Sequence, residues 1–392
     1  MIVPNNDQLF ASMKGEHWYK TQYKQTFEIA GGAGTGKTTM VLYFIDKIGL
    51  DLSEVLFVAY MGKAASQLAR NGLPAKTIHS ACYNYVIEVA RDENGNIILN
   101  EKGKPKKEYK FIKKDSIGKN IKLIVVDEAG TVDVKYCMDI LSFGLPVVAL
   151  GDLNQLPPPF GVSYFLQEPD VILRQIMRQA EGNPVIWMAN QILEGKRLNP
   201  GVYGNSRVIN RKDLTLAMLE KSDVVLTVTN KLRHQFNTLF RESIKGISNL
   251  SFPHIGEKVI CRRNNWKKVV GDNIALTNGL TGNVTYCDRA SYNGKTMIVD
   301  FKPDFSDADV FKNLKIDYAR LNNIDTGEES AFNHLDILEY AYALTIQSAQ
   351  GSQWDRPIFL DERLPFMSKE MLKKLRYTAI TRAKESVTVV QE

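Results

Sequence analysis

Short apolar runs alternate with helical stretches along the first half of the chain. Helical stretches begin at Lys37 and at Lys63, and each comes after an apolar run. A continuous apolar run is typical of a strand buried on both faces, and strands that alternate with helices predict a parallel sheet covered by helices. The runs of strand length are residues 26–30, 55–60, 123–126 and 146–150.

The second half of the chain has the same α/β character. Residues 224–228 read as a strand and residues 230–244 as a helix, and helix–strand alternation resumes from Leu338. A chain of 392 residues is too long for one ordinary domain and suits two or three. We therefore predict two α/β domains, at residues 1–170 and 171–392.

Two stretches without helical periodicity interrupt this pattern. Residues 92–120 are rich in lysine and contain Asn94-Gly95, a strong signal for a hairpin turn. They predict a small β-rich insertion on the first domain. Its lysines fit a solvated charged loop and a nucleic-acid contact equally well. Residues 282–333 predict a second β-rich insertion, on the second domain.

The composition indicates an ordinary globular protein but says little about its function. Hydrophobic residues make up 44% of the chain and charged residues 24%, as in an ordinary globular protein. The net charge of +6 is compatible with a polyanionic partner but does not require one. The four cysteines lie far apart, which argues against a disulfide framework or a zinc site.

No segment of the sequence indicates a membrane protein. The first ten residues, MIVPNNDQLF, lack the basic start and the apolar core of a signal peptide. No apolar run reaches the roughly 18 residues that a membrane-spanning helix needs. We therefore expect a soluble protein of a reducing compartment, the cytoplasm.

Residues 31–38, GGAGTGKT, match the P-loop pattern G-x-x-x-x-G-K-[ST] between a predicted strand and a predicted helix. The glycines let backbone N–H groups surround phosphate oxygens, and the helix N-terminus adds positive potential. Lys37 would reach the β- and γ-phosphates, and Thr38 would bind Mg²⁺. The residues expected to contact ATP here are Gly34, Thr35, Gly36, Lys37, Thr38 and Thr39.

A second element of the same chemistry lies about 90 residues further on. The apolar run that ends at Val126 is followed directly by Asp127 and Glu128. Ligands bind at the carboxyl ends of the strands in open parallel sheets. Asp127 would hold Mg²⁺, and Glu128 would activate the attacking water as a general base. The P-loop and this acid pair together predict ATP hydrolysis, with ATP and Mg²⁺ as cofactors.

Three further segments resemble the superfamily 1B helicases, in particular their RecD-like and Dda-like members. Residues 151–158, GDLNQLPP, and residues 377–384, YTAITRAK, closely resemble motifs III and VI of that group, and residues 345–351, TIQSAQG, resemble motif V. The resemblance runs from Gln8 to Lys384. It implies two RecA-like motor domains with small β-rich insertions, and a bacterial or phage-infected host cell as the setting.

The resemblance also implies roles for single residues. Gln155 would sense the γ-phosphate, and Arg178 and Arg382 would act as arginine fingers. Gln8 would read the adenine, and Gly351 would contact the nucleotide. The residues implied to contact nucleic acid are Lys63, Thr77, His79, Asn154 and Thr345.

In the family, the insertion predicted at residues 92–120 corresponds to the pin that separates strands. The one predicted at residues 282–333 corresponds to a small β-barrel. Tyr109 or Phe111 could stack on a base, an interaction worth about 1–3 kcal/mol. Either ring could equally well pack within the insertion itself.

The chain departs from the family pattern at several positions. Gln347-Ser348 stands where motif V usually has His-Lys, and Tyr60-Met61 stands where motif Ia usually has Pro-Thr. Ala129-Gly130-Thr131 follows the acid pair where Ala-Ser-Met is usual. These differences concern strand binding and its coupling to ATP rather than hydrolysis itself.

The sequence thus predicts an ATP-dependent DNA helicase or translocase that moves 5′ to 3′ on single-stranded DNA, the direction resting on the resemblance alone. The alternative is a nucleic-acid-stimulated ATPase that remodels protein–DNA complexes without efficient unwinding. A nucleotide-dependent switch is a third class, against which Glu128 argues. The expected partners of this monomer are single-stranded DNA and duplex junctions, with RNA possible, and replication or repair proteins, but no membrane.

Overall fold

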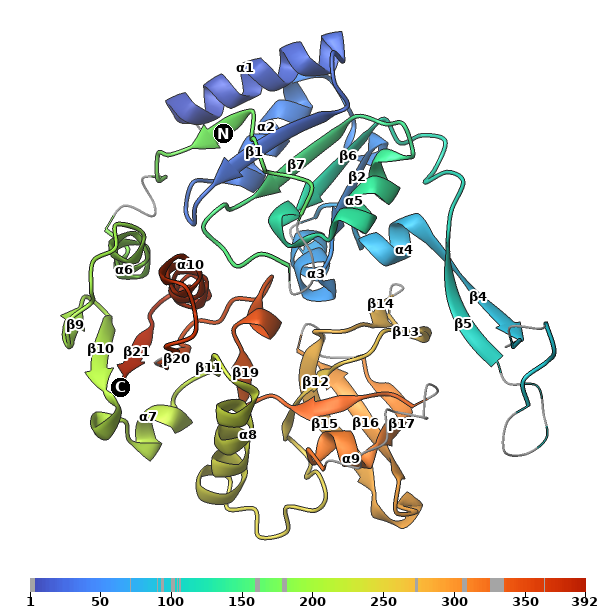
Figure 1. Ribbon diagram of the computed structural model, residues 1–392, viewed down its shortest axis with the longest axis vertical. Coiled ribbons are helices and arrows are strands. Elements are labelled where there is room, and N and C mark those ends of the chain that lie inside the picture. Colours follow the sequence, from blue (N-terminus) through green and yellow to red (C-terminus); the bar gives the residue numbers. More distant parts are fainter. Residues whose placement is uncertain are drawn as a thin grey trace.

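The computed structural model contains two six-stranded sheets, one in the upper half of Figure 1 and one at its lower left. It describes residues 4–392 except 71, 90, 93–94, 100–102, 104, 106, 159–162, 178–181, 272–273, 305–308, 325–334 and 363. In this part of the chain, no helix is both long enough and apolar enough to cross a membrane.

The first sheet has the strand order β3-β2-β6-β7-β1-β8, and every neighbouring pair is parallel. The predicted parallel sheet is thereby confirmed. Its strands are β1 (Thr26–Gly31), β2 (Val55–Ala59), β3 (Ala75–Thr77), β6 (Leu123–Asp127), β7 (Val147–Gly151) and β8 (Val171–Leu173).

Alternate side chains of these strands enter two separate cores, because successive residues of a strand point to opposite faces. Phe27 and Ile29 pack with α1 and α2, whereas Leu56 and Val58 pack with α4 and α5 on the other face. The helices of this domain are α1 (Asn6–Thr21), α2 (Lys37–Lys47), α3 (Gly62–Arg70), α4 (Ile78–Cys82) and α5 (Val134–Leu141).

The sequence pattern gave no sign of α1, whose polar and apolar residues follow no clear period. A capping box begins this helix: the side chain of Asn5 accepts a hydrogen bond from the N–H of Gln8, and the side chain of Gln8 accepts one from the N–H of Asn5. Two donors that would otherwise be unpaired are thereby satisfied. Ala11 and Trp18 then anchor the helix in the core.

The second sheet has the order β19-β11-β20-β21-β10-β9, parallel in every pair except β10 with β9. The expected fold class, two parallel-sheet α/β domains, is confirmed. Its strands are β9 (Gly201–Tyr203), β10 (Ser206–Asn210), β11 (Val225–Thr227), β19 (Ala343–Thr345), β20 (Ile358–Asp361) and β21 (Thr388–Gln391). Its helices are α6 (Pro184–Leu193), α7 (Leu216–Glu220), α8 (Asn230–Leu239), which a π-helical turn at Phe240–Ile244 continues, and α10 (Lys369–Ile380).

The domain boundary predicted after residue 170 is wrong by at least one strand. β8 pairs with β1, in the register Ala30 to Ile172, and therefore belongs to the first sheet. The chain passes to the second domain only after Leu173. The apolar pattern could not show this, because β8 has only three residues.

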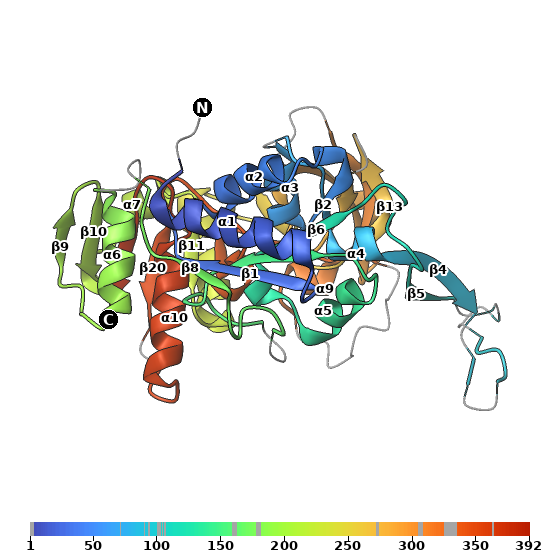
Figure 2. The same ribbon diagram turned by 90° about the horizontal axis from the view of Figure 1, so that it is seen from above.

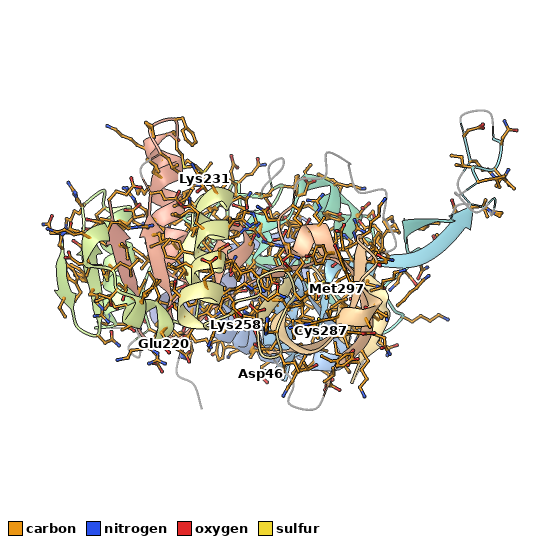
Figure 3. The ribbon with its side chains drawn as sticks, turned by 90° about the horizontal axis from the view of Figure 1, so that it is seen from below. Asp46, Glu220, Lys231, Lys258, Cys287 and Met297 are labelled. Atoms are coloured by element: carbon orange, nitrogen blue, oxygen red, sulfur yellow. The ribbon has the colours of Figure 1, made fainter. Side chains whose placement is uncertain are left out.

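The insertion of the second domain is larger than the predicted 282–333. It is a five-stranded antiparallel sheet in the order β17-β16-β15-β12-β18, and Lys258 and Met297 mark it in Figure 3. β12 is the first strand of the insertion and β18 is the last. These two strands pair directly, Val259 with Tyr340, so the two ends of the insertion lie next to each other. Its elements are β12 (Lys258–Cys261), β13 (Asn265–Val270), β14 (Ile274–Leu276), β15 (Thr281–Asp288), β16 (Thr296–Pro303), β17 (Phe311–Asp317), α9 (Tyr318–Leu321) and β18 (Leu338–Tyr340).

The insertion of the first domain is an antiparallel arm that projects from the domain (Figures 1 and 2). It consists of β4 (Tyr83–Val89) and β5 (Lys107–Lys113). The predicted range of 92–120 is therefore displaced. The arm begins nine residues earlier, at Tyr83, whereas Ile117 and Ile121 already pack against the core of the domain.

The antiparallel pairing of β15 with β16 leaves no room for a side chain at Gly282. An added Cβ atom would collide with the backbone carbonyl oxygen of Lys302 and lie 2.7 Å from the ring of Phe301. We expect Gly282→Ala to cost about 1–3 kcal/mol, as overpacking does elsewhere, and to lower the midpoint of thermal unfolding. Asn283→Ala, on the same strand, is the control. Equal midpoints for the two variants would contradict this packing.

Candidate nucleotide site and nucleic-acid interface

The predicted P-loop connects the end of β1 to the start of α2. Gly34 and Gly36 have φ angles of +79° and +72°, which glycine adopts without strain. The ammonium nitrogen of Lys37 lies 2.7 Å from the carbonyl oxygen of Gly31 and 3.3 Å from that of Gly32. The structure thus places the lysine beside the first residues of the loop. Thr38 and Thr39 are half-buried in the first turn of α2.

Asp127 ends β6, two strands from the P-loop strand in the sheet. Burial raises the pKa of Asp127 to about 6, and the neighbouring charge of Glu128 adds to that rise while Lys37 opposes it. The carboxyl group therefore binds its proton more tightly than an exposed aspartate does. A cation beside it would favour the charged form instead.

The residues at this edge fit a magnesium ion. Mg²⁺ takes oxygen ligands, keeps several waters and is usually held by one or two protein oxygens together with substrate phosphates. The hydroxyl of Thr38 and the carboxylate of Asp127 are such oxygens. Among the described residues no three His, Cys, Asp or Glu side chains form a metal site by themselves. A bound Mg²⁺ would neutralise charge on the phosphates.

Glu128 is held in a backbone conformation that residues other than glycine rarely adopt. Its φ angle is +50°, in the left-handed region, which costs about 1–3 kcal/mol. Its carbonyl oxygen accepts hydrogen bonds from the N–H (2.9 Å) and from the hydroxyl (2.8 Å) of Thr131. Thr131, which replaces the family's usual methionine, therefore fixes the turn that carries the candidate base.

Motif III begins where β7 ends, at Gly151. Asp152 shapes the turn, since its carboxylate accepts from the N–H of Asn154 (3.0 Å) and its carbonyl from the N–H of Gln155 (3.2 Å). Gln155 is 9% exposed, and its buried side-chain oxygen has no hydrogen-bond partner within the described part of the chain. An unpaired buried acceptor is costly, so this oxygen is suited to a contact that forms only with a ligand.

Arg382, at the end of α10, brings a buried guanidinium group from the second domain. It is 3% exposed. Burial lowers its pKa, and the negative charges of Glu128 and Asp152 lie close enough to oppose that shift. Its nitrogens donate to the carbonyl oxygens of Thr378 (3.0 Å) and Ser352 (3.3 Å) and to the hydroxyl of Thr381 (3.3 Å).

The second predicted finger, Arg178, lies outside the described residues. Its neighbour Met177 is described, and the N–H of Met177 donates to the carbonyl oxygen of Gly34 over 2.9 Å. The chain therefore touches the P-loop immediately before Arg178.

Gln8 reaches the P-loop, although through protein contacts. Its amide nitrogen lies 3.1 Å from the carbonyl oxygen of Thr35 and 3.3 Å from that of Gly36, and its oxygen caps α1. Adenine recognition by Gln8 stays a prediction. The sequence did not indicate the role of Asp7, the residue before Gln8. The carboxylate of Asp7 accepts hydrogen bonds from the N–H groups of residues 174 and 175, which follow β8, and so holds the start of the segment that leads to the second domain.

The loop of motif III is bonded to the second domain by residues for which the sequence predicted no interdomain contact. The N–H of Leu156 donates to the hydroxyl of Thr378 (2.9 Å), and its carbonyl oxygen accepts from the side chain of Gln350 (2.8 Å). Gln347 donates to the carbonyl oxygen of Pro157 over 3.2 Å. The glutamine that departs from the family pattern is thus itself an interdomain contact.

The predicted contact of Gly351 with the nucleotide is not supported, because the structure places Gly351 away from the P-loop. Its φ angle is +68°, and an added Cβ atom would lie 3.1 Å from that of Ala64 and 3.4 Å from that of Met61. These residues begin α3, after β2, and β6 and β7 separate β2 from the P-loop strand. Gly351 allows the two domains to approach each other closely at α3.

The residues predicted to contact nucleic acid are distributed over both domains: Lys63 and Thr77 lie on the β2–β3 side of the first sheet, Asn154 follows β7, and Thr345 ends β19 of the second sheet. The ammonium group of Lys63 lies 4.4 Å above the ring of Trp354 and 3.4 Å from the hydroxyl of Thr281, so it faces the second domain. Thr77 caps α4 through its hydroxyl group. Asn154 is half-buried in the motif III loop, and Thr345 bonds its hydroxyl to that of Ser348 over 2.8 Å.

An aromatic cluster joins the arm to the domain. The ring centroids of His79 and Phe111 lie 5.4 Å apart, those of His79 and Tyr136 lie 4.8 Å apart, and Tyr60 and Tyr83 complete the group. Burial lowers the pKa of His79, which favours the neutral imidazole. Phe111 packs here and is also 40% exposed, so it can support the arm and present a face to a base. Tyr109 pairs with Ile87 in the arm, but its side chain lies outside the described part of the structure.

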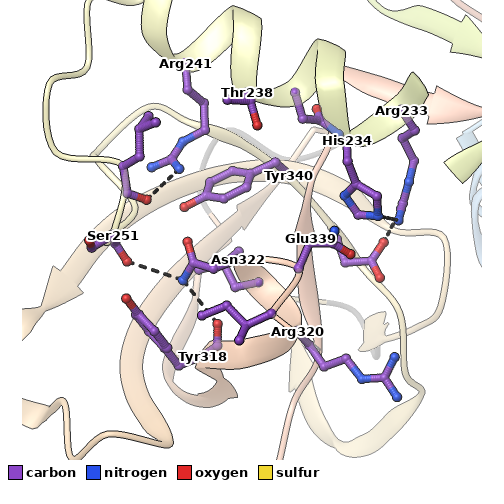
Figure 4. A pocket seen from close by; sticks show the side chains of 15 residues that line it. Arg233, His234, Thr238, Arg241, Ser251, Tyr318, Arg320, Asn322, Glu339 and Tyr340 are labelled. Carbon is purple, nitrogen blue, oxygen red and sulfur yellow. Dashed lines mark hydrogen bonds and ion pairs between the residues drawn. The ribbon is translucent and has the colours of Figure 1, made fainter. Parts of the chain in front are cut away.

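A cavity of about 370 Å³ lies away from this edge, between α8 and α9 of the second domain (Figure 4). The guanidinium group of Arg241 lies 3.9 Å above the ring of Tyr340. Arg233 and Arg241 form ion pairs with Glu339 and Glu257. Both arginines already have a carboxylate partner, so the P-loop is the better candidate for a nucleotide.

Comparisons with known proteins agree with this geometry. Residues 18–161 match the family model of an AAA domain, and residues 340–390 match that of a UvrD-like helicase C-terminal domain. The ATP-dependent RecD2 DNA helicase of Deinococcus radiodurans is 26% identical over 91% of this chain and 46% of its own length. An uncharacterized protein of Methanocaldococcus jannaschii is 24% identical over 93% of this chain and 36% of its own length. The chain thus spans less than half the length of these curated relatives.

Solved structures share the fold. The Pif1 helicase from Candida albicans has a TM-score of 0.54 at 18% identity, covering 100% of this chain and 94% of that one. The Pif1 helicase from Bacteroides, in complex with ADP-AlF3 and ssDNA, has a TM-score of 0.51 at 16% identity, covering 99% and 92%. In the order of its motifs, in its two matched family models and in its fold, the chain is similar to the superfamily 1B helicases.

Proposed function

We propose that the protein is an ATP-dependent DNA helicase that moves 5′ to 3′ along single-stranded DNA. One observation carries the proposal: the buried Arg382 of the second domain lies close enough to Glu128 and Asp152 of the first domain for their charges to act on it. A nucleotide site shared by two domains turns hydrolysis into relative motion of those domains.

The chemistry is the transfer of the γ-phosphoryl group of ATP to water. Glu128 accepts the proton of the attacking water, while Lys37 and Arg382 stabilise the charge on the phosphoryl oxygens. Thr38 and Asp127 hold Mg²⁺. Gln155, whose side-chain oxygen has no partner among the described residues, orients the water or contacts the γ-phosphate. The products are ADP and inorganic phosphate.

The DNA strand runs along the other part of the same sheet edge, past α3, α4 and the root of the arm. The surface that would carry it contains Phe111 and Asn154, and the two domains meet there at Gly351 and Lys63. The name of the Deinococcus relative, a DNA helicase, and the ssDNA in the Bacteroides complex support DNA as the partner. A solved Pif1 structure at forked dsDNA, with a TM-score of 0.53, supports the duplex junction.

Hydrolysis is tested by Glu128→Gln. The amide keeps the size of the side chain but cannot accept the proton, so we expect turnover to fall by about 10²-fold or more while ATP affinity is retained. Steady-state hydrolysis and equilibrium binding of ATP measure the two effects. Glu168→Gln, a change of the same kind outside the site, is the control. A Glu128→Gln protein that hydrolyses ATP at the original rate would exclude Glu128 as the base.

Strand separation is tested at the arm. We expect Phe111→Ala to slow unwinding of a duplex with a 5′ single-stranded tail more than it slows DNA-stimulated ATP hydrolysis, because the lost stacking, about 1–3 kcal/mol, acts only at the junction. Tyr23→Ala, which removes an aromatic ring that is 63% exposed on the first domain, is the control. An equal loss of both activities would indicate a damaged fold, and faster opening of 3′-tailed duplexes would contradict the proposed direction.

A further inference from the structure

A tyrosine of the second domain reaches into the P-loop of the first. Tyr377 lies on α10 and is 1% exposed. Its hydroxyl oxygen accepts a hydrogen bond from the N–H of Ala33 over 2.9 Å and donates one to the carboxylate of Asp152 over 2.7 Å. One phenol group therefore joins the P-loop, motif III and motif VI.

The contact lies at the end of the loop that faces the terminal phosphate. The lysine of a P-loop binds the β- and γ-phosphates. The ammonium group of Lys37 lies beside the carbonyl oxygens of Gly31 and Gly32, and the N–H of Ala33 belongs to the same peptide group as the carbonyl of Gly32. An added Cβ atom at Gly32 would lie 3.1 Å from the hydroxyl oxygen of Tyr377, and among the described residues no heavy atom outside its chain neighbours lies closer. The hydroxyl group therefore lies directly over this part of the loop.

A phosphate group and the tyrosine compete for the same donor. Burial and the nearby charge of Asp152 raise the pKa of Tyr377, so the phenol is neutral. Phosphate oxygens are charged, and hydrogen bonds to charged acceptors are about twice as strong as neutral ones. A γ-phosphate at this end of the loop displaces the phenol from the N–H of Ala33. ADP has no group to do so.

We propose that Tyr377 is a positioning residue that distinguishes ATP from ADP. Its hydroxyl group holds the N–H of Ala33 while the γ-phosphate is absent and releases it when the γ-phosphate binds. The release alters the bond to Asp152, whose turn carries Gln155. The inference rests on the proposed function to the extent that the P-loop binds ATP.

Equilibrium binding of the non-hydrolysable analogue AMP-PNP and of ADP, each with Mg²⁺, tests the proposal. The γ-phosphate no longer has to break a hydrogen bond in Tyr377→Phe, so AMP-PNP should bind about two- to tenfold more tightly while ADP affinity stays the same. Tyr340→Phe is the matched control, because Tyr340 is also a buried tyrosine of the second half and its hydroxyl group has no hydrogen-bond partner among the described residues. Its AMP-PNP to ADP affinity ratio should equal that of the unaltered protein.

A second variant approaches the same contact from the loop. In Gly32→Ala the methyl group presses on the hydroxyl group of Tyr377 and should weaken its bond to Ala33, raising the AMP-PNP to ADP affinity ratio. In the double variant with Tyr377→Phe the methyl group meets no hydroxyl, so the second change should add nothing. Strictly additive effects would mean that the two groups do not interact.

An affinity ratio unchanged in Tyr377→Phe, or AMP-PNP and ADP affinities that change together, overturns the role of Tyr377. If the unaltered protein binds AMP-PNP and ADP but does not hydrolyse ATP, the helicase proposal is overturned. The ratio of the two affinities can still be measured, so the role of Tyr377 is tested separately. An unaltered protein that binds neither nucleotide overturns both.

Discussion

The loop of motif III is the contact on which the arrangement of the two domains depends. It leaves the first sheet at Gly151, and four side chains of the second domain bond to it within six residues, namely Tyr377 at Asp152, Thr378 and Gln350 at Leu156, and Gln347 at Pro157. Three of these bonds use the loop backbone, which cannot move without breaking them. A rotation between the two sheets must therefore displace the turn that carries Gln155.

Several energetically costly features of the molecule lie on the same sheet edge. Glu128 has a left-handed backbone, Asp127 has a raised pKa, and the side-chain oxygen of Gln155 is buried with no hydrogen-bond partner among the described residues. Arg382 is a buried cation whose pKa is lowered by burial and raised by the charges of Glu128 and Asp152. Such features persist where the surrounding fold holds them and a ligand relieves them. Under the proposed function, Mg²⁺ and a triphosphate would be the ligands that relieve them.

Local sequence was enough to predict a nucleotide site, but it did not indicate the contacts that join this site to the second domain. Lys37 and Asp127 were predictable because each follows a strand whose apolar run can be read directly. Tyr377 and Asp152 are 225 residues apart in the sequence, and Gln347 and Pro157 are 190 residues apart. A local hydrophobic pattern cannot predict contacts between residues so far apart. The same limit explains the misplaced Gly351 and the insertion that really begins near Lys258: both depend on which distant strands pair.

Steady-state ATP hydrolysis with and without single-stranded DNA, and with single-stranded RNA for comparison, tests the central claim most directly. If the contacts across the motif III loop join the nucleotide site to a strand path at α3 and α4, hydrolysis rises steeply as DNA is added and then saturates. A rate that neither polymer changes would contradict the account, since the two halves of the sheet edge would then work independently and a nucleotide-dependent switch would describe the protein better.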